Sequence, residues 1–152
     1  MKKDTIENYP TLKLENQICF QLYACSREIM KHYTPHLTEL GLTYTQYLVM
    51  LVLWDKGALT VKELGAELYL DSGTLTPLLK KMEAKGFISR TKSTADGRNL
   101  IIETTKAGNR LKEKAATIPL KLQAFVQLPE GDIMEFRRIV HHLLKVANES
   151  LK

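Results

Sequence analysis

Apolar residues recur along most of the chain with the three- to four-residue period of amphipathic helices. Near the N-terminus this spacing predicts a helix over 14–33. Thr34-Pro35 should end or bend that helix, because proline disfavours helical geometry in the residue before it. A helical segment is also predicted over 105–125, with a kink at Pro119. A last helix carries a long apolar stripe made of Ile133, Phe136, Val140, Leu143 and Ala147.

A capping box marks the start of a helix in the middle of the chain. Thr43 is followed three residues later by Gln46, so that each side chain can satisfy a backbone N–H of the first turn. The apolar run that follows extends to Trp54, and Gly57 is placed to end the helix. The sequence therefore predicts a helix between Thr43 and Gly57.

A second capping box and a polar break predict a helix-turn-helix. Thr60 and Glu63 open a short helix that runs to about Leu70. The break at 71–73 supplies a cap for the next helix, 74–85, which ends at a glycine. Two short helices joined by a tight polar turn have the helix-turn-helix arrangement.

Two β-rich segments follow this pair of helices. Residues 87–92 and 100–103 read as strands, and the Asp96-Gly97 pair between them is typical of a hairpin turn. Helix, turn, helix and basic hairpin together form the plan of a winged helix. The predicted fold is mainly α with a small β-hairpin wing, in a single chain over 1–152. Within it, 43–104 would be the DNA-binding region, whereas 12–40 and 105–152 would form a helical dimerisation region.

Composition and charge narrow the function. The chain has 152 residues, a net charge of +5 and 26% charged residues, which fits one ordinary domain. Three of the five net positive charges fall between Asp71 and Arg98, which suits an acidic partner such as DNA, although charge alone favours a solvated lysine face. No apolar segment is long enough to span a membrane and no signal peptide is evident. We therefore expect a cytoplasmic protein without membrane contact.

The second helix of the pair is the expected reader of duplex DNA, because a major groove admits one helix. Its Thr76 and Lys80 share a face, and Arg98 at the hairpin tip, oriented by Asp96, could enter a minor groove. Asp96 and Arg98 could instead only pair with each other across the turn. The long terminal stripe favours a homodimer, which suits a palindromic operator. The residues expected at DNA are Ser72, Gly73, Thr74, Thr76, Pro77, Lys80, Arg90, Lys92, Asp96 and Arg98.

The cysteine and histidine content is small. Cys19 and Cys25 are too few for a disulfide scaffold, and from the residues alone Cys19 would be a buried structural thiol. Pro35 disturbs the helix between His32 and His36, and the adjacent pair at 141–142 cannot face one metal from a helix. We expect neither a metal site nor a cofactor.

Several dispersed segments resemble one family closely. The stretches 16–24 (Asn-Gln-Ile-Cys-Phe-Gln-Leu-Tyr-Ala), 42–48 (Leu-Thr-Tyr-Thr-Gln-Tyr-Leu) and 68–80 resemble the organic-hydroperoxide-sensing branch of the MarR family, the OhrR-type repressors. The resemblance extends from about Leu12 to Lys114 and more loosely to the end. It departs at Thr45, where the family usually has proline, and at Gly97, where the family has glutamate.

The resemblance implies a homodimeric winged-helix repressor that is not an enzyme and that responds to oxidation of one cysteine. The sensing cysteine matches Cys19. The tyrosines that reach its sulfur from the partner subunit match Tyr33 and Tyr44, and a further pocket tyrosine matches Tyr23. The implied oxidant is an organic hydroperoxide, after which the protein would lose or alter its binding to double-stranded DNA.

The second cysteine is not expected to resolve the oxidised one. Six residues of helix place Cys25 about 9 Å along the axis and about 240° around it from Cys19, which is beyond disulfide reach. The oxidised Cys19 would then form a mixed disulfide with a low-molecular-weight thiol or oxidise further. The alternatives are a MarR-type regulator released by a small aromatic ligand, a thiol peroxidase, and an interaction module that does not bind DNA.

Overall fold

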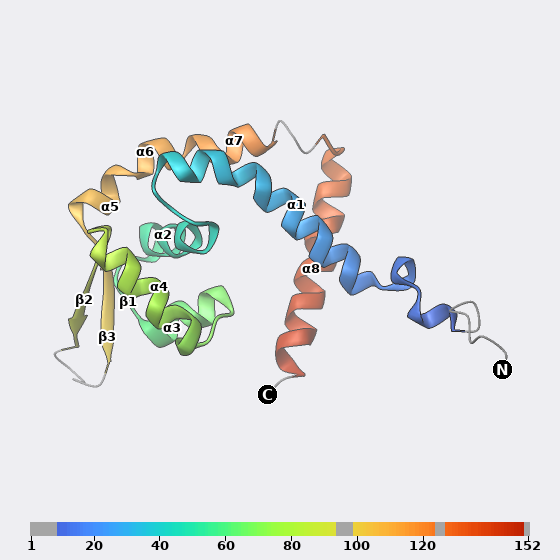
Figure 1. Ribbon diagram of the computed structural model, residues 1–152, viewed down its shortest axis with the longest axis horizontal. Helices are drawn as coiled ribbons and strands as arrows, with labels where there is room; N and C mark the ends of the chain where they lie inside the picture. Colours follow the sequence, from blue (N-terminus) through green and yellow to red (C-terminus); the bar gives the residue numbers. More distant parts are fainter. Residues whose placement is uncertain (1–8, 94–98, 124–126, 151–152) are drawn as a thin grey trace, which may run out of the picture. The chain divides into compact units, whose positions relative to one another are not determined.

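The computed structural model describes residues 9–93, 99–123 and 127–150 of the chain. Helix α2 (Tyr44–Lys56) lies at the centre of the N-terminal part of the chain, as Figure 1 shows. It contacts α1 (Ile18–Glu39), α3 (Val61–Leu68), α4 (Ser72–Ala84) and β3 (Leu100–Thr104). Its Val49 and Met50 are fully buried. The rest of this core consists of leucines, isoleucines and one methionine from the surrounding elements, namely Leu37, Leu64, Leu75, Leu79, Met82, Ile88 and Ile102.

Both predicted capping boxes are formed. Thr43 accepts a hydrogen bond from the backbone N–H of Gln46, whose side-chain oxygen accepts the Thr43 N–H at 3.1 Å. Thr60 and Glu63 make the same pair of bonds at the start of α3. Gly57 ends α2 with a φ of 77°, a left-handed value that glycine adopts without a steric penalty. The predicted start and end of α2 are therefore confirmed.

The helix-turn-helix is confirmed, with shifted boundaries. α3 ends at Leu68 rather than near Leu70, because Tyr69 adopts a left-handed backbone with a φ of 55°. α4 begins at Ser72, and the Asp71 carboxylate caps it by accepting the Thr74 N–H at 2.8 Å. Pro77 lies at the sixth position of α4, inside the helix.

The strands form a three-stranded antiparallel sheet in the order β1-β3-β2. β2 (Ile88–Lys92) and β3 are the predicted hairpin, with Arg90 opposite Ile102. β1 (Leu59–Thr60) was not predicted, because two residues carry no readable alternation. The predicted hairpin tip, with Asp96 and Arg98, lies outside the described residues.

The first long helix differs from its prediction at both ends. Residues Leu14–Asn16 form a 3-10 turn, η3, after a similar turn, η2 (Pro10–Leu12), so α1 starts at Ile18. α1 then continues through Pro35 to Glu39, although Thr34-Pro35 was predicted to end or bend it. Leu37 in this continuation and Leu40, which follows the helix as its C-cap, are 1% and 6% exposed. Their burial offsets the backbone hydrogen bond that proline cannot donate.

The predicted helical segment 105–125 is divided into short helices: α5 (Lys106–Arg110), α6 (Lys112–Ala115) and α7 (Thr117–Gln123). The interruptions fall at Leu111 and Ala116, and Pro119 lies inside α7. The chain divides into two compact units at Ile118 and Pro119, and the second unit contains α8 (Glu130–Glu149). Among the residues described, no helix is both long and apolar enough to cross a lipid bilayer.

Close packing of Gly108 in α5 provides a test of this fold. A Cβ added there would lie 2.1 Å from the Phe87 carbonyl oxygen and 3.0 Å from Met50 Cε. We expect Gly108→Ala to lower the free energy of unfolding by about 1–3 kcal/mol, because an overpacked core must shift its backbone. Urea unfolding followed by circular dichroism measures this change.

Gly131 in α8 is the matched control. A Cβ there would meet nothing within 4 Å, so Gly131→Ala should leave the unfolding free energy unchanged or slightly raise it. Equal losses for the two variants would contradict the proposed contact between α5 and the segment before β2.

Candidate redox site and nucleic-acid interface

Cys19 lies in the first turn of α1 and is exposed to solvent. The residues alone predicted a buried structural thiol at Cys19, and this prediction is wrong. The helix start at Ile18 places the sulfur-bearing residue among the backbone N–H groups that lack partners within the helix, and Gln17 provides no side-chain cap. The positive end of the helix dipole favours an anion in this turn. Cys19 is therefore accessible to a reagent from solvent.

Tyr33 and Tyr44 lie together at the contact between α1 and α2. Their rings are 4.9 Å apart between centroids and meet edge to face at 67°, a favourable aromatic geometry. Tyr44 is the first residue of α2, so the capping box at Thr43 fixes its backbone. The structure thus brings together two of the predicted redox residues.

Tyr47 is a third phenol that the sequence analysis did not single out. Its ring lies 6.2 Å from that of Tyr33, and the residue is only 2% exposed. It follows Tyr44 by three residues on a helix, a spacing that places both on one face and could have drawn attention to it. The three rings form one cluster, the tyrosine cluster, defined by Tyr33, Tyr44 and Tyr47.

Burial favours the neutral form of Tyr44 and Tyr47. It raises the pKa of Tyr44 above the ordinary 10.0, and the neighbouring Tyr33 raises it further. Burial likewise raises the pKa of Tyr47, with smaller contributions from Tyr33 and Tyr44. Protonated phenols remain hydrogen-bond donors at physiological pH, which is the property needed to stabilise an anionic sulfur.

Cys19 and the tyrosine cluster do not meet within one chain. Cys19 and Tyr33 are 14 residues apart on α1, and at 1.5 Å per residue this is about 21 Å along the helix axis. No phenol side chain spans that distance. Contact between the thiol and this cluster therefore requires a second copy of the chain.

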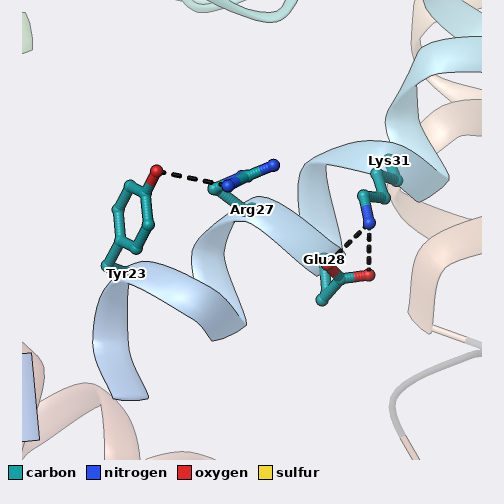
Figure 2. A network of polar contacts seen from close by, with 4 residues as sticks. All are labelled: Tyr23, Arg27, Glu28 and Lys31. Carbon is teal, nitrogen blue, oxygen red and sulfur yellow. Dashed lines mark hydrogen bonds and ion pairs between the residues drawn. The ribbon is translucent and has the colours of Figure 1, made fainter. Parts of the chain in front are cut away.

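Tyr23, the remaining predicted redox residue, follows Cys19 by one turn on α1 and is 58% exposed. Figure 2 shows its hydroxyl accepting a hydrogen bond from Arg27 Nη1 at 3.3 Å, and the guanidinium carbon lies 5.5 Å from the centre of its ring. The adjacent Glu28–Lys31 ion pair, 2.6 Å long, is exposed, so it adds little stability. Arg27 thus holds the Tyr23 ring along the helix.

α4 separates its buried and exposed residues cleanly. Leu75, Leu79 and Met82 are buried against the core. The residues of α4 predicted to contact DNA are all exposed, namely Ser72, Gly73, Thr74, Thr76, Pro77 and Lys80. The exposed set follows helical spacing from the first turn onward, as a helix inserted into a groove requires.

The hydroxyls of α4 are already donating. Thr74 Oγ1 donates to the Asp71 carboxylate at 2.9 Å, and Thr76 Oγ1 donates to the Ser72 carbonyl at 2.7 Å. The lone pairs of Thr76 consequently remain to accept from an outside donor. The backbone N–H of Thr74 lowers the pKa of Asp71, followed by the hydroxyl of Thr74, so this cap stays ionised.

Arg90 of β2 has a partner that the sequence analysis did not predict. Its Nε and Nη2 both donate to Glu83 Oε2 of α4, at 2.8 and 2.6 Å, and its side chain is only 19% exposed. This ion pair joins the second helix of the helix-turn-helix to the hairpin strand. Lys92 farther along β2 is exposed. Among the described residues, no three metal-ligating side chains lie close enough to hold a metal ion.

The raised pKa values of Tyr44 and Tyr47 predict how stability depends on pH. As pH rises through 10, the unfolded chain loses these phenolic protons while the folded chain keeps them, so the unfolded state is favoured. We expect the free energy of unfolding to fall above pH 10. Urea unfolding between pH 9 and pH 11 measures the decline.

Tyr44→Phe/Tyr47→Phe is the control for this dependence. The double variant lacks both phenols and should show a shallower decline over the same pH range. An equally steep decline in parent and variant would show that the tyrosine cluster is not its source.

Known proteins resemble this chain over most of its length. The MarR family matches residues 42–100. The chain is 46% identical over 138 residues to the organic hydroperoxide resistance transcriptional regulator of Bacillus subtilis, which covers 91% of this chain and 94% of that protein. It is 50% identical over 105 residues to the HTH-type transcriptional regulator SarZ of Staphylococcus saprophyticus, covering 69% of this chain and 72% of the relative.

A solved structure extends the likeness to three dimensions. AbfR is a protein of Staphylococcus epidermidis, and its reduced form bound to DNA superimposes with a TM-score of 0.77. That match has 32% sequence identity and covers 95% of this chain and 99% of AbfR. The sequence relatives, the structural match and the winged helix agree, and the chain belongs to the MarR family.

Proposed function

We propose that the protein is a DNA-binding transcriptional repressor that senses organic hydroperoxides by oxidation of Cys19. After this oxidation it would lose or alter its binding to the operator. The observation that carries the proposal is the separation of an exposed Cys19 from two paired phenols on the same chain by about 21 Å. Cys19 and these phenols can form one site only when two copies of the chain associate. The similarity to an organic hydroperoxide resistance regulator supports the choice of oxidant.

Exposed apolar side chains on two helices support a homodimer. In α1, Ile18 and Leu22 are 65% and 41% exposed. In α8, Phe136 and Leu143 are 53% and 42% exposed, although they belong to the predicted stripe. Apolar faces left uncovered on a single chain mark an interface. A second copy that covers α1 would carry its own Tyr33 and Tyr44 toward Cys19, with Tyr23 lining the same pocket.

The sensing step is a two-electron oxidation. The Cys19 thiolate attacks the terminal oxygen of the hydroperoxide, the O–O bond breaks, and the leaving alkoxide takes a proton to become an alcohol. Cys19 becomes a sulfenic acid. A low-molecular-weight thiol then attacks the sulfenic sulfur and releases water, which leaves a mixed disulfide. Cys25 is also an exposed thiol, but lies about 9 Å farther along α1 and does not take part.

The DNA-binding surface consists of the exposed face of α4 together with the wing. Ser72, Gly73 and Thr74 approach the backbone and Thr76 accepts from a base edge, while Pro77 and Lys80 lie farther along the helix. Arg90 and Lys92 of β2 belong to the same surface, and from the sequence we also assign Asp96 and Arg98 to it. Such a surface reads one half-site, and a twofold dimer reads two. The protein would act in the cytoplasm, where its thiol stays reduced until challenged.

Replacing Cys19 tests the sensing step. An operator is first selected from random duplex DNA with the reduced protein, and gel shifts then compare reduced and cumene-hydroperoxide-treated samples. We expect the parent and Cys25→Ser to lose affinity on oxidation, whereas Cys19→Ser keeps it, because only Cys19 reacts. Mass spectrometry should place the adduct on Cys19.

Two outcomes would overturn the proposal. Release of DNA by oxidised Cys19→Ser would remove the cysteine from the mechanism. Sustained consumption of hydroperoxide in the presence of a thiol reductant, rather than one equivalent for each reduction, would favour a peroxidase over a sensor.

Two substitutions in α4 separate the roles proposed for its exposed residues. Lys80→Ala should weaken binding to all duplexes alike and lower the slope of log K against log salt by about 1, because one phosphate contact is lost. Thr76→Val should leave that slope unchanged and alter the ranking of operator variants, because its hydroxyl reads a base. Fluorescence anisotropy over a salt series measures both. The same slope for all three proteins would contradict phosphate contact by Lys80.

A further inference from the structure

Lys85 joins two regions that are distant in sequence. It is the C-cap residue of α4, and its Nζ donates to the Gly41 carbonyl oxygen at 2.6 Å. A longer contact of 3.5 Å reaches Gln46 Oε1. Gly41 precedes α2 and Gln46 lies in its first turn, 44 and 39 residues before Lys85. One ammonium group therefore bridges the end of α4 and the beginning of α2.

The acceptors of Lys85 are built into the turn that carries the tyrosine cluster. Gln46 is only 4% exposed, and its Oε1 also accepts the backbone N–H of Thr43. Tyr44 lies between Thr43 and Gln46 in the chain, and Tyr47 directly follows Gln46. A displacement of Tyr44 therefore moves the capping box, and with it the oxygen atoms that Lys85 contacts.

The α4 side of the bridge is equally constrained. Backbone bonds from Gly86 to Glu83 and from Phe87 to Met82, 2.8 and 3.1 Å long, close the turn after Lys85. Thr105 Oγ1 donates to the Gly86 carbonyl at 2.6 Å and holds this turn from the other side. A displacement of Lys85 would therefore be transmitted to α4, because hydrogen bonds hold the turn that follows Lys85.

We propose that Lys85 is a positioning residue that transmits the state of the cysteine site to α4, an inference that rests on the proposed function. When oxidation changes what the tyrosines bond to, the first turn of α2 shifts and the hydrogen bonds of Lys85 lengthen or break. Apolar contacts between α2 and α4 tolerate a shift of a fraction of an ångström. A charge-assisted hydrogen bond is directional and weakens steeply with distance and angle, so it discriminates between the two positions.

Replacing the ammonium group tests this link. Dissociation constants for the selected operator are measured by anisotropy for reduced and cumene-hydroperoxide-treated protein. We expect Lys85→Met to lower the oxidised-to-reduced ratio of these constants by about tenfold, within the usual range of coupling between sites. Lys85→Arg, which keeps a cationic donor, should restore most of the ratio. Cys19 oxidation, followed by mass spectrometry, should proceed at the parent rate.

Lys81→Met is the matched control. It removes the same charge one turn earlier on α4, and its ratio should equal that of the parent. An unchanged ratio in Lys85→Met, or an equal fall in Lys81→Met, would overturn the inference. So would a fall in the thermal midpoint of Lys85→Met together with loss of binding in the reduced state, because that result assigns Lys85 a structural role only.

A double-mutant cycle tests the link without oxidation, so that its failure differs from failure of the proposed function. Tyr44→Ala and Lys85→Met are combined, and operator binding is measured on reduced protein. Coupled residues should give a double variant that departs from the product of the single effects by more than about threefold. Independent effects would overturn the link even where the parent responds to hydroperoxide. A parent that fails to respond, beside a coupled cycle, would overturn the proposed function alone.

Discussion

The burial of α2 is the constraint on which the first unit of this protein depends. One helix, with Val49 and Met50 wholly inside, supplies packing partners for α1, α3, α4 and β3. Close-packed interiors resist continuous deformation, so elements that share one central helix move relative to it in discrete steps. The tyrosine cluster lies at the beginning of this helix, and α4, which carries the proposed DNA-binding surface, packs against it. A shift of α2 would therefore reach both places.

Helix geometry sets the second constraint. Because α1 is continuous from Ile18 through Tyr33, the thiol and the phenols are held apart by a rigid rod. Under the proposed function, a single chain would be inactive as a sensor, and the chemistry would depend on assembly. The exposed apolar side chains of α1 would then serve two purposes, because a dimer contact there would also complete the site.

The sequence was informative where local chemistry determines structure. The boxes at Thr43 and Thr60 placed two helix starts correctly, because a cap is a contact between near neighbours. It failed where tertiary packing outweighs local preference. Pro35 should have ended or bent α1, but buried leucines beyond it keep the helix intact. β1 escaped notice because its pairing with β3 is a long-range contact, visible only in the folded chain.

The candidate site likewise contains residues that the sequence could predict and residues that it could not. The pairing of Tyr33 with Tyr44 could be anticipated from the family resemblance, whereas Tyr47 and Lys85 could not. Their importance lies in contacts between elements rather than in any motif. The exposure of Cys19 was also beyond reach of the residues alone, because a free cysteine with apolar neighbours has the composition of a core position.

The Glu83–Arg90 ion pair has a consequence for how operators are distinguished. By fixing β2 to α4, it sets the spacing between the part of the protein that enters one groove and the strand that leads toward the next. Duplexes differ in local twist and groove width according to their sequence. If the spacing between α4 and β2 is fixed, the protein would bind most tightly to a duplex whose grooves already have the matching separation. Selectivity would then extend to base pairs that no side chain touches.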